Sequence, residues 1–116
     1  MTVKEMAAQL QFQVLTENDA LNREILDIFC CDLLSFVMGR APADSAWVTV
    51  MGNINSVAVA SLADIACIVL AENAQMDEAA LSRAAEQEIA VLRTSLPIYS
   101  AAKQIDLLAC PQKTQS

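Results

Sequence analysis

Residues 46–70 read AWVTVMGNINSVAVASLADIACIVL and decide the fold class of this chain. Two apolar runs, 46–51 and 66–70, flank a turn at 52–55 and a nearly all-apolar stretch at 57–63. Neither outer run alternates polar and apolar residues, which is typical of strands buried on both faces of a sheet. A helix that is apolar nearly all round is expected to be covered on more than one side. The order strand, helix, strand therefore predicts parallel pairing around a crossover helix.

The same order continues toward the C-terminus. We expect a helix that begins at Asp77 or Glu78, then a short strand over 90–92. Ser95 is expected to cap a last helix, with Pro97 in its first turn. Alternating strands and helices predict an α/β layered fold for the second half of the chain.

The first half is less regular. The expected elements are a helix over 3–10, strands over 11–16 and 25–31, and a short helix over 33–38. Thr2 and Glu5 match a capping box at the start of the first helix. Asp32 is expected to cap the helix over 33–38, and Gly39 to end it. We treat 1–110 as a single domain and 111–116 as a frayed tail.

Composition argues against several functions. The chain has 7 basic and 14 acidic residues, a net charge of −7, and no histidine. An acidic surface does not suit a nucleic-acid partner, because phosphate binding needs basic side chains. The lack of histidine removes the commonest metal ligand and the commonest general base near neutral pH. Composition does not exclude catalysis, but most of its usual side chains are missing. We expect no catalytic residue, no cofactor and no metal.

The sequence also bears on the compartment. The first residues lack the long apolar region of a signal peptide. Residues 57–71 are too short for a membrane span, which needs roughly 20 apolar residues. The four cysteines contain no C-x-x-C pair; they are Cys30, Cys31, Cys67 and Cys110. We expect reduced thiols in the cytoplasm and no membrane association. A redox or metal site stays open as an alternative, because a thiol before a helix, such as Cys31, can be reactive.

The candidate site is the loop 51–56, between a strand and a helix. In open α/β sheets ligands bind at this edge, where helix N-termini offer free N–H groups. Gly52 would allow close approach, while Asn55 or Ser56 would cap the helix that follows. The alternative is that this loop is only a turn and a cap. The candidate ligand-binding residues are Arg23, Asp32, Gly52, Asn53, Asn55 and Ser56.

Arg23, Asp64 and Trp47 also have structural interpretations. Arg23 lies among acidic neighbours, so a surface salt bridge is the alternative to its role as an anion contact. Asp64 ends the apolar helix and could pair with a basic residue. Trp47, on a central strand, is expected in the core.

Three segments together resemble the DRTGG domain family: CDLLSFVMGR at 31–40, AWVTVM at 46–51 and NSVAVASLAD at 55–64. The resemblance extends from about Leu10 to Ile105. The family's naming motif would fall at 22–28, where only Arg23 is kept. Asp27 and Ile28 stand where the motif has two glycines, and neither replaces glycine freely at positive φ.

The resemblance implies a three-layer α/β/α domain with a mixed, mostly parallel sheet. Related domains occur at the amino end of HPr kinase/phosphorylase, inside some phosphotransacetylases and beside CBS domains. The resemblance also implies a regulatory role without catalysis, so we expect that the chain is not an enzyme. We expect a homodimer that senses a small, anionic ligand or acts on a partner enzyme; the alternative is an assembly module without a ligand. Leu33, Phe36 and Val37, with the helix over 57–63, are expected to supply partner surface.

Overall fold

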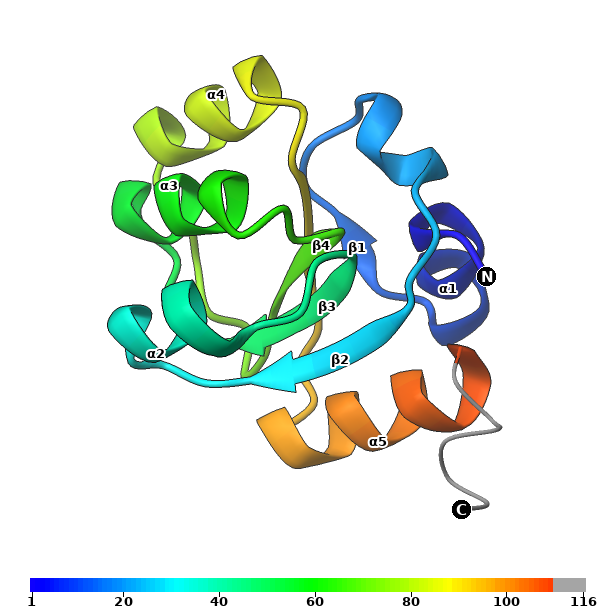
Figure 1. The fold of residues 1–116 in the computed structure, drawn as a ribbon. Helices are drawn as coiled ribbons and strands as arrows, with labels where there is room; N and C mark the ends of the chain where they lie inside the picture. Colours follow the sequence, from blue (N-terminus) through cyan, green and yellow to red (C-terminus); the bar gives the residue numbers. More distant parts are fainter. Residues whose placement is uncertain (110–116) are drawn as a thin grey trace.

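A five-stranded sheet separates two layers of helices in this computed structural model, which describes residues 1–109 (Figure 1). The helices are α1 (Val3–Leu10), α2 (Leu34–Arg40), α3 (Ile54–Leu62), α4 (Glu78–Glu86), α5 (Ile98–Ala109) and the 3-10 helix η1 (Asp19–Asn22). The strands are β1 (Gln13–Val14), β2 (Asp27–Cys30), β3 (Ser45–Thr49), β4 (Cys67–Leu70) and β5 (Ala90–Arg93). The predicted three-layer α/β/α fold is confirmed.

The strand order is β1-β5-β4-β3-β2, with parallel pairing from β2 to β5 and antiparallel pairing of β1 with β5. Partner residues form rows across the sheet. One row contains Phe29, Trp47, Ile68 and Val91. Since α2, α3 and α4 cover one face while α1 and α5 cover the other, both faces of the central strands are buried (Figure 1).

Each face has its own apolar core. Trp47, Ile68 and Val91 pack toward α3 and α4, whereas their neighbours in sequence pack toward α1 and α5. Trp47 is fully buried, as predicted, and its indole Nε1 donates to the carbonyl oxygen of Cys31 at 2.8 Å. Double burial explains why the central strands carry no alternation of polar and apolar residues.

Helix α3 is flanked by α2 and α4, so the expected cover on more than one side is present (Figure 1). Its outer face remains open, because the side chain of Leu62 is 72% exposed. The predicted cap was wrong: α3 begins at Ile54, and Asn53 is its N-cap rather than Asn55 or Ser56.

Two predictions about α2 were also wrong. Its N-cap is Leu33, without a side-chain hydrogen bond, and the Asp32 carboxylate binds elsewhere. The helix runs through Gly39 to Arg40 and ends before Pro42. A residue before proline is driven out of the helical region, so the proline sets the end.

The other elements lie close to prediction. The capping box of Thr2 and Glu5 is present, and Asp77 caps α4. Helix α5 begins at Ile98, so Ser95 lies three residues ahead of it rather than at the cap. The predicted tail, 111–116, lies outside the described residues.

Candidate functional site

The parallel strands β2, β3, β4 and β5 all end at one edge of the sheet, here called the carboxyl edge. Asp32 follows β2 at this edge, beside the end of β3. Its Oδ1 accepts from the hydroxyl of Thr49 at 2.6 Å and from the backbone N–H of Val50 at 3.1 Å. The Asp32 carboxylate therefore ties together the ends of two strands.

The loop after β3 is held by its own side chains. Asn53 Oδ1 accepts from the N–H of Ser56 at 3.0 Å, and the buried hydroxyl of Ser56 donates to the carbonyl oxygen of Met51. These bonds satisfy one free N–H group in the first turn of α3 and a buried hydroxyl without a ligand. Asn55 differs, because its side chain is exposed and forms no hydrogen bond within residues 1–109.

Gly52 is required for close packing within the chain. A Cβ placed on Gly52 would overlap the carbonyl oxygen of Gln75 and lie 3.3 Å from the Cα of Met76. Its φ is not positive, so no left-handed turn explains the glycine. The loop before α4 thus occupies the approach that the sequence analysis assigned to a ligand.

Arg23 lies at the opposite end of the sheet, among segments that precede β3 and β4. Its guanidinium contacts Asp44 Oδ1 at 2.5 Å and Asp64 Oδ1 at 3.2 Å, and it donates to the carbonyl oxygen of Ile65 at 2.9 Å. The predicted pairing of Asp64 with a basic residue is confirmed. The structure therefore places Arg23 apart from the other five candidates and gives it structural partners.

The cysteines have different surroundings. Burial raises the pKa of the Cys67 thiol to about 12, and Cys67 is fully buried in the sheet. Burial, together with the Asp32 carboxylate, also raises the pKa of the Cys30 thiol. Residues 1–109 contain no cluster of three or more cysteine or acidic side chains able to hold a metal ion. Cys110 lies outside the described residues.

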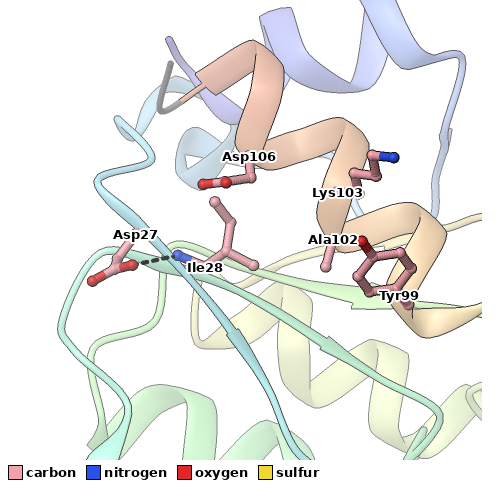
Figure 2. A pocket seen from close by; sticks show the side chains of 6 residues that line it. All are labelled: Asp27, Ile28, Tyr99, Ala102, Lys103 and Asp106. Carbon is pink, nitrogen blue, oxygen red and sulfur yellow. Dashed lines mark hydrogen bonds between the residues drawn. The ribbon is translucent and has the colours of Figure 1, made fainter. Parts of the chain in front are cut away.

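A hollow of about 440 Å³ lies between β2 and α5 (Figure 2). Asp27 and Ile28 line it from β2, and Tyr99, Lys103 and Asp106 from α5. Figure 2 shows the amino end of Lys103 directed away from both carboxylates. This hollow therefore does not suit the anionic ligand that the sequence analysis expected.

A second hollow, of about 290 Å³, forms a groove between α3 and α4. Asn55 and Ser61 line it from α3, opposite Arg83 and Gln87 of α4. The Ser61 hydroxyl lies 3.2 Å from Gln87 Oε1. Of the six candidates, only Asn55 lines this groove.

A third hollow, of about 410 Å³, lies at the carboxyl edge where β5 meets β1. It contains Arg93, which the sequence analysis missed because the residue merely followed a short predicted strand. No local sequence pattern marks Arg93, since its neighbours in the hollow come from distant segments.

No helix within residues 1–109 is long and apolar enough to span a membrane.

Comparison with known proteins gives three results. The family model described as the DRTGG domain matches residues 5–108. No curated protein matches the sequence. Among solved structures, the CBS and DRTGG domains of the regulatory region of Clostridium perfringens pyrophosphatase, complexed with its activator diadenosine tetraphosphate, match with a TM-score of 0.72 and 8% identity. The match covers 90% of this chain and 45% of that one, so this chain spans under half of the solved protein.

Proposed function

The chain belongs to the DRTGG domain family, and from this membership we propose that it is a regulatory domain that senses a small anionic ligand and catalyses no reaction. We further propose that it works in the cytoplasm as a homodimer. The single observation that carries the regulatory role is the shared fold with a solved protein whose DRTGG domain forms part of a regulatory region.

The carboxyl edge supports ligand sensing. Asp32, Asn53 and Ser56 fix the loops there through hydrogen bonds, so their geometry is set before a ligand arrives. A preorganised edge loses little conformational entropy on binding. In this proposal these residues position the loops, and Asn55, with its unused amide, contacts the ligand.

Exposed apolar side chains support dimerisation. On α2 and the residue before it, Phe36 is 50% exposed and Leu33 is 56% exposed, while on neighbouring α3 Ile54 is 43% exposed. Val37, expected to belong to this surface, is instead fully buried. Apolar side chains exposed on adjacent helices are typical of an interface between protein chains.

Native mass spectrometry of the protein purified under reducing, oxygen-free conditions tests both parts of the proposal. We expect a dimer that carries a discrete small-molecule adduct, whose mass would identify the ligand. A monomer without adduct would contradict the proposal. An adduct-free dimer would favour the assembly module, and bound iron or sulfide would favour the metal alternative.

The surface on α2 is tested with a matched pair of variants. Phe36→Asp is expected to give a monomer, because it buries a charge in the interface. Leu107→Asp introduces the same charge on α5, where the side chain is 56% exposed, and is expected to remain a dimer. If sedimentation shows that Phe36→Asp remains a dimer like Leu107→Asp, α2 is not the interface.

A further inference from the structure

The hollow beside Arg93 combines a half-buried cation with neutral polar side chains. Arg93 ends β5 and pairs with Gln13 of the edge strand β1. The side chains and backbone of four segments surround the hollow, so distant parts of the chain build it together. It is lined by Leu10, Gln11, Gln13, Asn73, Arg93, Thr94, Ser95, Leu96 and Gln104.

Arg93 lacks a partner in the described part of the chain. Its Nε is buried and makes no hydrogen bond there, and no described carboxylate pairs with its guanidinium. Arg23 shows the contrast, since its guanidinium contacts two carboxylates and two carbonyl oxygens. A buried donor without an acceptor costs free energy, so a ligand that brings an acceptor to this guanidinium would be stabilised.

The loops around the hollow are fixed in place. The N–H of Asn73 donates to the carbonyl oxygen of Thr94 at 2.8 Å, which holds the loop after β4 against the end of β5. The Thr94 hydroxyl accepts from the N–H of Leu96 at 3.2 Å, so its own proton is available to another acceptor. The amides of Gln11, Gln13 and Gln104 are further donors in the same lining.

Charge and size narrow the ligand class. Within the described lining, Arg93 is the only charged residue, and the chain as a whole carries −7. One guanidinium matches one carboxylate in a planar, bidentate pair, whereas a polyphosphate would need several cations. A volume of about 410 Å³ is within the range of small-molecule sites.

We propose that this hollow binds a small metabolite through one carboxylate group, with Arg93 as its counter-ion and the surrounding amides and hydroxyls as donors. The proposal places the ligand of the regulatory domain in this hollow, so it rests on the proposed ligand-sensing function. Asn55 does not line the hollow, so this site replaces the contact with Asn55 proposed above. It assigns the charged contact to Arg93 in place of Arg23.

Titrations of the full chain with acetate, inorganic phosphate and chloride at equal ionic strength, followed by backbone amide NMR, test the site. Acetate is expected to give saturable shifts at Gln11, Asn73, Thr94 and Ser95, and chloride is not. Arg93→Gln is expected to weaken acetate binding about tenfold or more. Arg93→Lys keeps the charge but loses the planar fork, so we expect an intermediate loss.

Arg83→Gln is the matched control, because it removes the same charge from an exposed position on α4. Its acetate affinity is expected to equal that of the unaltered protein. Unsaturable shifts, or equal affinity in Arg93→Gln, would overturn the site. Tighter binding of phosphate than of acetate would overturn the carboxylate assignment.

Native mass spectra of Arg93→Gln separate this proposal from the regulatory function. If the unaltered protein retains an adduct and Arg93→Gln loses it, both proposals are supported. If Arg93→Gln keeps the adduct, the ligand-sensing function stands and this site is wrong. If acetate binds at Arg93 but the purified protein is an adduct-free monomer, the site stands and the proposed function fails.

Discussion

The carboxylate of Asp32 and the hydroxyl of Thr49 lie 2.6 Å apart, Oδ1 to Oγ1, at the carboxyl ends of β2 and β3. Thr49 is fully buried, and its Oγ1 also accepts from the N–H of Met51 at 3.1 Å. The hydroxyl thus both donates and accepts, and it links the loop before α2 to the loop before α3.

Thr49→Val is expected to lower the free energy of unfolding by about 1–3 kcal/mol, because the N–H of Met51 loses its acceptor and Asp32 loses a donor. Valine keeps the shape of threonine, so packing changes little. Urea denaturation measures the difference. Asp32→Asn, which keeps an acceptor oxygen, is the control and is expected to cost less. A Thr49→Val protein as stable as the original would show that the link contributes nothing.

The two glycines are expected to respond in opposite directions to alanine. Gly52→Ala would force its Cβ against Gln75, so we expect a loss of about 1–3 kcal/mol. Gly39→Ala places its Cβ in open space within α2 and is expected to gain about 0.5–1 kcal/mol. Thermal unfolding of the pair provides the measurement. Equal unfolding temperatures for the two variants would mean that the loop before α4 does not pack closely against Gly52.

Arg23→Gln is expected to cost about 1–3 kcal/mol, since several charge-assisted hydrogen bonds are lost. Asp64→Asn removes only one ion-pair partner, whose side chain is 70% exposed, and is expected to cost under about 1 kcal/mol. Denaturant titration of both variants tests the ranking. The reverse order would mean that the exposed ion pair, rather than the carbonyl contacts, stabilises this region.

Cys67 predicts a loss of stability at alkaline pH. Its pKa is raised to about 12 in the folded protein from an ordinary value of 9.0, so the folded state binds more protons than the unfolded state between these values. Its contribution is complete below about pH 9 and falls, by up to about 1.4 kcal/mol per pH unit, as the pH rises toward the folded pKa.

Cys67→Ala isolates this effect, because it removes the thiol and should flatten the slope of stability between the ordinary pKa of 9.0 and the raised pKa of about 12. Comparison of slopes, rather than of absolute stabilities, allows for the cavity that alanine leaves. An unchanged slope would exclude Cys67 as its source. Thiol alkylation of the folded protein at pH 8 is also expected to spare Cys67.

Much of the fold could be predicted because its signals are local. Trp47 and Ile68 lie in apolar runs that need no distant information to identify as buried strands. The antiparallel pairing of β1 depends instead on the contacts of Gln13 and Val14 with β5, almost 80 residues away, so the local pattern showed only a strand.

The wrong predictions of helix caps have a common cause. Asp32, Asn55 and Ser56 all have side chains suited to capping, and sequence alone does not say which N–H each will meet. In the structure Asn53 caps α3, while the Asp32 carboxylate accepts a hydrogen bond from Thr49, 17 residues away. Arg93 became a candidate because its Nε has no acceptor among residues 1–109. A sequence pattern does not show that an acceptor is absent.

The contacts of Arg23 also have a consequence for folding kinetics. Its partners lie 21 to 42 residues along the chain, just before β3 and β4, so we expect these contacts to form only after those strands have docked. Interactions that form after the transition state change the unfolding rate far more than the folding rate. Substitution of Arg23 is therefore expected to raise the unfolding rate. The refolding rate, given by the refolding arm of the chevron plot, is expected to change little.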